Sequence, residues 1–236
     1  MTQTKSPLVL VTGVGPGTGT SIVRQFAREG YRVAMIARDA DRLARLEAEL
    51  PGCRAFRCDV TDTAALLATL DAVEQEMGSP DVVVHNAVGG AWGTYAEITA
   101  DVLTRNFEIN TVALLHLAQR LVPAMVARGS GALIVTGNTS ALRGKASFAG
   151  FAPTKAAQRI LTEAIARDVG PKGVHVAYIV IDAVIDVEWT RARFPEAPDD
   201  FFIKPDAIAD EVWHVVGQDR SAWSFNVEIR PYRETW

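Results

Sequence analysis

Short apolar runs alternate along this chain with longer segments in which apolar and polar positions follow a helical period. The short runs are rich in Val, Ile, Leu and Ala, which is typical of strands in a parallel sheet covered on both faces. The pattern predicts strands at Leu8–Thr12, Arg32–Ala37, Arg54–Arg57, Asp81–His85, Ala132–Thr136, Val174–Ile181 and Phe225–Ile229. It predicts helices at Thr20–Glu29, Asp41–Leu50, Ala64–Met77, Asp101–Ala127, Phe151–Val169 and Asp206–Val216. This order indicates an α/β fold.

No repeat, linker or low-complexity tract divides the sequence of 236 residues. We therefore expect one domain over 1–236, a doubly wound Rossmann fold with a seven-stranded, mainly parallel sheet and helices on both faces. Ligands of such folds bind at the carboxyl ends of the strands. One irregular stretch, 182–205, contains Pro195 and Pro198. A connection of this length predicts a flap over a substrate site.

Composition and charge exclude several classes of protein. Hydrophobic residues make up 48% of the chain and charged residues 22%, which is enough for a sizeable core. The net charge of −4 argues against a nucleic-acid or membrane surface, and the run Leu8–Val11 is too short to span a bilayer. Cys53 and Cys58 have neither metal nor redox spacing, and no histidine pairs with them. We expect reduced thiols, no metal and a cytoplasmic protein.

The clearest chemistry follows the first strand, in the stretch TGVGPGTG. It fits the pattern T-G-x-x-x-G-x-G at Thr12, Gly13, Gly17 and Gly19, whereas Thr18 breaks the pattern G-x-G-x-x-G. Glycines permit positive φ and let a phosphate approach the main chain, and the following helix N-terminus attracts the anion. A purely structural tight turn is the alternative. The pattern resembles that of the short-chain dehydrogenase/reductase family.

The resemblance continues at the ends of the third and fourth strands. In the family, an Asp after the third strand holds the adenine amino group, and Asn-Ala-Gly follows the fourth. Asp59, followed by Val60, and Asn86 match these positions, while Val88 replaces the glycine. These matches imply cofactor-binding roles for Asp59, Val60 and Asn86. We interpret the neighbouring His85 as structural.

The end of the second strand, Ala37-Arg38-Asp39, indicates the preferred cofactor. An acid here binds the ribose 2′-OH of NAD, whereas an Arg suits the 2′-phosphate of NADP. A guanidinium binds phosphate through two parallel hydrogen bonds. Asp39 and Asp41 are alternative ribose ligands, but both lie where a helix N-cap is expected. We favour NADP(H), bound through Arg38.

The catalytic half departs from the family pattern, which is Tyr-x-x-x-Lys with a Ser thirteen residues before the Tyr. Lys155 is present, but Phe151 replaces the Tyr and Asn138 replaces the Ser. A phenyl ring cannot donate a proton. Asn138 could still bind a substrate oxygen, and Lys155 the nicotinamide ribose. The resemblance also implies that Asn110 kinks its helix and holds a water linked to Lys155.

Three sources of the proton remain open: Lys155 through water, Ser140, or the substrate itself. Other candidates are Tyr95, Thr136, Thr139, Asp182 and Asp186. An electrophilic substrate such as an iminium or a conjugated enone would need less help from an acid.

After the sixth strand the family usually has Pro-Gly, an aliphatic residue and Thr, which close on the nicotinamide. Here the stretch reads Asp182-Ala183-Val184-Ile185, which is similar to a branch with Phe-x-x-x-Lys, and Ile185 is the candidate cofactor contact. Trp92 and Trp189 lie in loops that overhang the substrate site in this fold. They predict an apolar or aromatic substrate pocket, or else they cover the core.

Two functions remain open. The first is an NADP(H)-dependent oxidoreductase that acts on a small carbonyl, enone or imine with a non-standard proton donor. The second is a dinucleotide-binding regulatory or scaffold protein without redox turnover. The resemblance also implies a homodimer or homotetramer, built on the helices that begin near Asp101 and Phe151.

Overall fold

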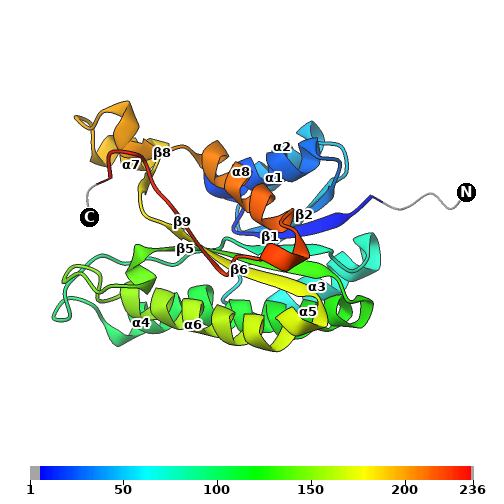
Figure 1. Ribbon diagram of the computed structural model, residues 1–236. Helices are drawn as coiled ribbons and strands as arrows, with labels where there is room; N and C mark the ends of the chain where they lie inside the picture. The colour runs from blue at the N-terminus through cyan, green and yellow to red at the C-terminus, as the bar shows by residue number, and fades with distance from the viewer. Residues whose placement is uncertain (1–5, 235–236) are drawn as a thin grey trace, which may run out of the picture.

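A central parallel sheet covered by helices on both sides forms the body of the protein (Figure 1). The structure, a computed structural model, describes residues 6–234. The sheet has seven strands in the order β3-β2-β1-β4-β5-β6-β9. Their bounds are β1 Leu8–Thr12, β2 Arg32–Ala37, β3 Cys53–Arg57, β4 Val82–His85, β5 Gly131–Asn138, β6 Val174–Ile181 and β9 Asn226–Ile229. The strand order reverses between β1 and β4, which confirms the doubly wound fold.

The helices also lie close to their predicted ranges. They are α1 Thr18–Arg28, α2 Ala40–Glu49, α3 Thr63–Met77, α4 Ala100–Phe107, α5 Ala113–Arg128, α6 Ala152–Val169 and α8 Pro205–Val216. Short 3-10 turns lie at Thr139–Ala141, Gly170–Lys172, Asp199–Phe201 and Arg220–Ala222. Asp39 and Asp62 begin α2 and α3 by accepting hydrogen bonds from N–H groups of the first turn.

Strand β1 shows how the sheet divides the core into two layers. Leu8 and Leu10 belong to a cluster with side chains of α3 and α5, whereas Val9 and Val11 belong to a second cluster with side chains of α1, α2 and α8. Successive residues of a strand face opposite sides of the sheet. Both faces of β1 are therefore buried, and this explains its unbroken apolar run.

The long helix predicted at Asp101–Ala127 is interrupted. A π-helical turn, Glu108–Val112, separates α4 from α5. The helical segment Ala100–Arg128, with a hydropathy of 1.3, is long and apolar enough to pass a length-and-composition test for membrane crossing. Leu114, Leu117 and Leu121 are nevertheless buried in the core against the sheet. The apolar character of the segment is therefore that of a core helix.

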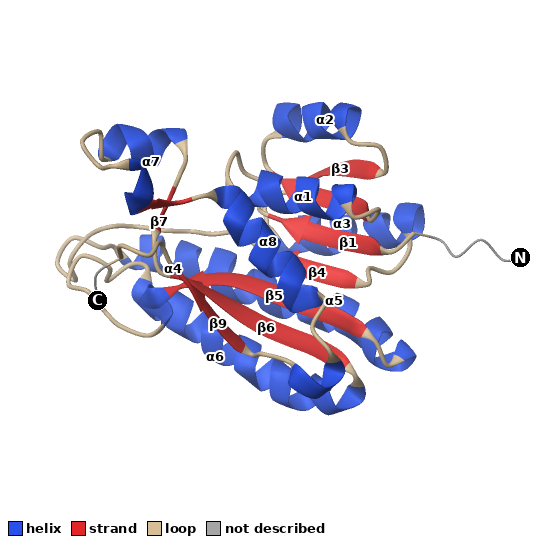
Figure 2. Ribbon diagram, turned by 45° about the horizontal axis from the view of Figure 1, so that its top comes forward, coloured by secondary structure: helices blue, strands red, loops and turns tan. Residues whose placement is uncertain are grey.

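The expectation that the stretch 182–205 is irregular is wrong. It contains β7 Val184–Ile185, α7 Glu188–Arg193 and β8 Phe202–Ile203, with β7 parallel to β8. Figure 2 shows this small unit, which we call the flap, set apart from the main sheet. Its helix and strands are too short to give a hydrophobic period in the sequence. Each is stabilised by contacts within the flap.

Candidate active site

The glycine-rich turn after β1 lies in close contact with the chain that follows β4. Gly13 has φ +72°, and a Cβ atom there would lie 2.5 Å from Ala87 Cα. A Cβ atom at Gly19 would lie 2.3 Å from the Gly13 carbonyl oxygen. Side chains cannot approach backbone atoms so closely, so both positions require glycine.

The turn leads into α1, whose N-terminus has no side-chain cap. Thr18, the first residue of α1, lines a cavity. Its hydroxyl oxygen is buried and has no hydrogen-bond partner within residues 6–234. Backbone N–H groups and the helix dipole at this end attract an anion. A phosphate oxygen would satisfy the unpaired hydroxyl, so the donors fit the pyrophosphate of a dinucleotide.

The cavity has a volume of about 760 Å³ and lies at the carboxyl ends of the first strands. This size is within the range of about 300–1,000 Å³ that is usual for small-molecule sites. Most of the predicted cofactor-binding residues line it, namely Gly13, Gly17, Gly19, Arg38, Asp59, Val60, Asn86 and Ile185. Thr12 and Lys155 do not belong to its lining.

Asn86 fastens the glycine turn to the sheet. Its side-chain amide donates to the Gly13 carbonyl at 2.8 Å, and its side-chain oxygen accepts from the Thr136 hydroxyl at 2.9 Å. Thr12 lies beneath, where its hydroxyl oxygen is 2.9 Å from Nδ1 of the fully buried His85. Burial lowers the pKa of His85 to about 3. This histidine is a neutral part of the core, in agreement with its structural interpretation.

Two arginines, Arg38 and Arg42, line the cavity where β2 ends. Asp39 is the N-cap of α2 and accepts from the Arg42 N–H at 3.0 Å. The Asp39 carboxylate also forms an ion pair with the Arg42 guanidinium at 2.9 Å. The hydrogen bond from the Arg42 N–H is the main cause that lowers the pKa of Asp39. Asp39 itself lines the cavity, with its carboxylate engaged within α2, whereas Asp41 does not line it.

Asp59 is held at the same end of the cavity. One carboxylate oxygen accepts from the Thr61 N–H at 3.1 Å and from the Thr61 hydroxyl at 2.9 Å, and the other pairs with Arg105 at 3.2 Å. Burial opposes ionisation, but these hydrogen bonds and the Arg105 charge lower the pKa of Asp59. The carboxylate is therefore ionised and fixed in place, and it can accept a hydrogen bond from an amino group.

Lys155 is buried and does not line the cavity. Its side chain is 2% exposed. Nζ donates to the Thr136 carbonyl at 3.2 Å and to Gln158 Oε1 at 2.5 Å. Burial lowers the pKa of Lys155 from 10.5 to about 7. Burial thus weakens the hold of the amine on its proton, which suits a group that exchanges a proton.

Asn110 lies in the π-helical turn between α4 and α5. Its side-chain oxygen accepts from the Gly89 N–H at 3.0 Å, and its side-chain nitrogen donates to the Gly89 carbonyl at 2.8 Å and the Thr154 hydroxyl at 2.8 Å. Its own carbonyl accepts from Gln158 Nε2 at 2.6 Å. Asn110 and Lys155 are thus linked through Gln158, and the side chain of Asn110 joins three parts of the site.

The positions usually occupied by the catalytic hydroxyls hold other groups. Phe151 directly precedes α6, and its ring lies 3.8 Å from where a Cβ atom of Gly90 would be. The Asn138 side-chain oxygen accepts from the Ser140 N–H at 2.9 Å and so caps a 3-10 turn. Ser140 lines a separate hollow of about 370 Å³. Tyr178 is fully buried, which raises its pKa, so its phenol does not replace the missing one.

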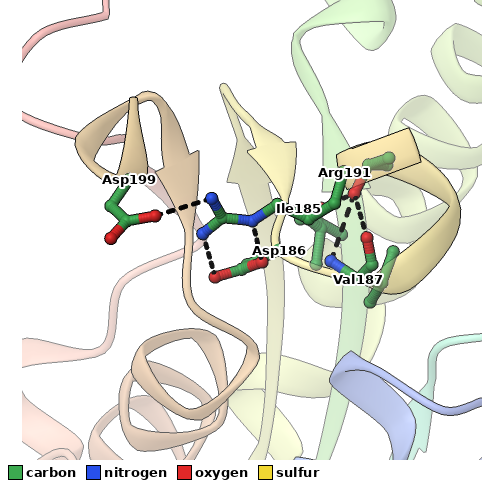
Figure 3. A network of polar contacts seen from close by, with 6 residues as sticks. Ile185, Asp186, Val187, Arg191 and Asp199 are labelled. Carbon is green, nitrogen blue, oxygen red and sulfur yellow. Dashed lines mark hydrogen bonds and ion pairs between the residues drawn. The ribbon is translucent and has the colours of Figure 1, made fainter. Parts of the chain in front are cut away.

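Arg191 holds the flap together (Figure 3). It donates to both oxygens of Asp186, at 2.7 and 2.8 Å, and to Asp199 at 2.7 Å, and its guanidinium lies 4.1 Å from the Phe202 ring centre. Its hydrogen bonds lower the pKa of Asp186. Thr190 also donates to the Ile185 carbonyl at 2.5 Å. The flap is therefore an ordered unit, in which Asp186 is already engaged.

The base of the flap rests on the glycine turn. A Cβ atom at Gly17 would lie 2.6 Å from Val187 Cγ1. Val187 and Trp189 line the cavity together with Ile185. Gly17, the second glycine of the motif, thus makes room for the flap, and the flap covers this end of the cavity.

Four aromatic side chains, which we call the aromatic cluster, lie together, one of them in the flap: Trp92, Phe148, Phe151 and Trp189. The ring centres are 6.2 Å apart for Trp92 and Trp189, 6.4 Å for Trp92 and Phe148, and 6.4 Å for Phe148 and Phe151. Backbone hydrogen bonds at 2.8 Å and 3.2 Å join Gly93 to the chain on either side of Phe148. The two tryptophans expected at the substrate site are therefore brought together.

Sequence reasoning missed three polar residues of the site. Arg42 reaches the cavity from the first turn of α2, and Thr18 was noted only as a break in the glycine pattern. Gln158 had a detectable signal, because it lies three residues after Lys155 and hence on the same face of the helix. Of the other proton-donor candidates, Tyr95 is 90% exposed and Asp182 pairs with Arg143 at 3.3 Å.

Known proteins share both this sequence pattern and this fold. The chain is 31% identical over 180 residues to 7alpha-hydroxysteroid dehydrogenase of Escherichia coli (strain K12), over 75% of this chain and 70% of the relative. It is 30% identical over 169 residues to L-xylulose reductase of Homo sapiens, over 71% and 68%. An alcohol dehydrogenase from the archaeon Thermococcus sibiricus, complexed with 5-hydroxy-NADP, has the same fold, with a TM-score of 0.88, 24% identity and 98% of both chains covered.

The sequence profile of the short chain dehydrogenase family matches residues 7–196. This range includes the glycine turn, the cavity and the catalytic half of the sheet. The chain therefore belongs to the short chain dehydrogenase family of nicotinamide-dependent oxidoreductases.

Proposed function

We propose that this protein is an NADP(H)-dependent oxidoreductase that transfers a hydride to or from a small carbonyl, enone or imine substrate. The observation that carries the proposal is the cavity, in which an uncapped helix N-terminus and the unpaired Thr18 hydroxyl lie at one side and Arg38 and Arg42 line another. These donors match the two phosphate positions of NADP. When bound, the nicotinamide supplies or accepts the hydride.

The cavity residues have distinct roles in this proposal. Arg38 and Arg42 bind the 2′-phosphate, and the ionised Asp59 accepts a hydrogen bond from the adenine amino group. The engagement of Asp39 within α2 supports NADP(H) over NAD(H), because that carboxylate already accepts two interactions from Arg42. Ile185 covers the nicotinamide half of the site and excludes water from it.

Proton transfer follows an unusual route in this proposal. Phe151 has no proton to donate, so the donor is either Lys155 acting through water, the Ser140 hydroxyl, or a substrate that needs none. The pKa of Lys155, lowered by burial to about 7, supports the first route. Asn138 would then orient a substrate oxygen with its side-chain amide.

A second function, dinucleotide binding without turnover, has one observation in its favour. The Lys155 ammonium faces Thr136 and Gln158 and does not border the cavity. A protein of this kind would bind NADPH but would not oxidise it, whichever substrate is supplied.

We further propose that the protein forms a homodimer or homotetramer through α5 and α6. Leu115 and Ile160 are 37% and 59% exposed on these helices, and Val112 is 38% exposed just before α5. Such apolar surface is typical of an interface. Light scattering of the purified protein would measure the state.

Calorimetric titration with NADPH and NADH tests the cofactor assignment. We expect tighter binding of NADPH, and a loss of roughly 10- to 100-fold in its affinity for Arg38→Ala and Arg42→Ala, because each removes charge-assisted hydrogen bonds to phosphate. The affinity for NADH should not change. Arg45→Ala is the matched control, since Arg45 is exposed on α2 and does not line the cavity. Binding of neither cofactor would refute the proposal.

A further inference from the structure

The substrate side of the site combines two features that standard carbonyl reduction does not explain. The phenol is replaced by Phe151, and the Asn138 oxygen is engaged by the Ser140 N–H. In addition, aromatic rings crowd the place where a substrate would lie. Reduction of a ketone needs a proton for the developing alkoxide. A substrate whose reduction needs no proton would not depend on the missing donors.

The aromatic cluster presents open ring surface. Trp92 and Trp189 are 58% and 56% exposed, and their rings are inclined by 65° with centres 6.2 Å apart. Because Trp189 also lines the cofactor cavity, the cluster is continuous with it. The exposed parts of the two indole rings attract a cation, since the ring faces carry negative charge and Trp binds cations best among the aromatic residues.

The charges around the cluster also favour a cation. The flap between residues 184 and 203 contains five acidic and two basic side chains. Three of the five acids are paired, Asp186 and Asp199 with Arg191, and Asp200 with Arg233 from outside the flap. Arg143 and Lys145 line a hollow together with Phe148, and Arg143 pairs with Asp182. The flap, to which Trp189 belongs, therefore carries excess negative charge of its own, which favours cations near it.

From these observations we infer that the aromatic cluster binds cationic imines, that is, iminium ions, as substrates; this rests on the proposed function. The iminium carbon accepts a hydride from the reduced nicotinamide, and the C=N π pair becomes the lone pair of the amine nitrogen. The positive charge passes to the oxidised nicotinamide. No proton enters or leaves, so the step balances without the hydroxyls that Phe151 and Asn138 replace.

The first test measures binding without cofactor. We would titrate the protein with the N-methylated dihydroisoquinolinium cation and with tetralone, a neutral ketone of similar shape. We expect the cation to bind at least about tenfold tighter, and Trp92→Leu and Trp189→Leu each to weaken its binding about three- to tenfold. Tyr95→Leu is the matched control, because Tyr95 is a 90% exposed aromatic residue of the same loop as Trp92 but lies outside the cluster. Equal binding of cation and ketone, or tryptophan variants that bind like wild type, would overturn the inference.

The second test follows NADPH oxidation by the same two compounds. We expect turnover of the cation and at least about tenfold less of the ketone, because a ketone requires the missing acid. We also expect the rate with the cation to stay constant as pH crosses the Lys155 pKa of about 7. If NADPH binds but the cation is not reduced, the substrate class is wrong and the cofactor assignment stands. If NADPH does not bind, the proposed function fails, while the binding test still judges the aromatic cluster.

Discussion

The buried amine of Lys155 makes a sharp prediction about stability and pH. Its side chain is 2% exposed, and in the described part of the chain it forms no ion pair. Nζ instead has two neutral acceptors, the Thr136 carbonyl and the Gln158 side-chain oxygen. Burial lowers the pKa of Lys155 from 10.5 to about 7. Lys155→Met removes the amine and keeps a chain of similar length, so it isolates this effect.

The sign follows from proton binding in the two states. Between the folded pKa of about 7 and the unfolded value of 10.5, the unfolded chain holds the proton and the folded chain does not. Raising the pH therefore favours the folded state across this window. At about 1.4 kcal/mol for each pH unit, the whole window amounts to about 5 kcal/mol in the free energy of unfolding. Below pH 7 both states hold the proton, and the folded state bears the full cost of a buried cation.

Urea denaturation followed by tryptophan fluorescence, in reducing buffer at several pH values, measures this effect. The stability of wild type relative to Lys155→Met should rise by roughly 3 kcal/mol between about pH 7 and pH 9.5. Comparing the two proteins cancels the titration of Cys53, whose pKa burial raises to about 11. Lys145→Met is the control, because Lys145 is exposed. The difference in the free energy of unfolding between wild type and this variant should be the same at every pH. A rise of less than about 1 kcal/mol for Lys155→Met would refute the reasoning.

Three other predictions concern the flap and the catalytic position. Gly17→Ala should weaken NADPH binding about tenfold, because its Cβ would lie 2.6 Å from Val187 Cγ1. Calorimetry should show that adding Val187→Ala partly restores the affinity. If it does not, the clash with the flap is not what weakens binding. Arg191→Ala should make amide hydrogen exchange in 184–203 at least about tenfold faster, because the ion pairs to Asp186 and Asp199 are lost. Unchanged exchange would show that other contacts hold the flap. Phe151→Tyr should raise ketone reduction about 100-fold or more over wild type and Phe151→Leu should not, since only the phenol supplies an acid; equal rates in steady-state assays would contradict this.

The main fold could be predicted because its signals are local. Strands such as Val174–Ile181 are buried along their whole length, so each is an unbroken apolar run bounded by polar residues. The flap could not be predicted in this way. Its helix has six residues and its strands have two each. What orders them is the contact of Arg191 with Asp186 and Asp199, which exists only after the chain has folded.

The candidate site was predictable where backbone geometry decides the residue. Gly13 and Gly19 lie where a side chain would collide with the main chain. Only glycine fits there, so the requirement is visible in the sequence as a motif. The direction in which a long side chain points is not visible in the sequence. Lys155 has four rotatable side-chain bonds, and its orientation toward Gln158 depends on which neighbours α6 and β5 bring together. Arg42 likewise reaches the cavity from a helix turn whose own pattern resembles that of any amphipathic helix.

The attachment of the flap has a consequence for how this protein could acquire new specificities. The chain enters the flap at Asp182, whose N–H donates to the Ile229 carbonyl at 2.9 Å, and leaves it at α8, where Ile208 is buried in the core. Between these fixed points, β7 and β8 pair in parallel and join the two ends of the flap. The segment 186–201, which connects β7 to β8, can thus be replaced without moving these two strands. Evolution or a protein engineer can replace it by another of different length or charge while the register of the sheet and the phosphate-binding turn stay as they are.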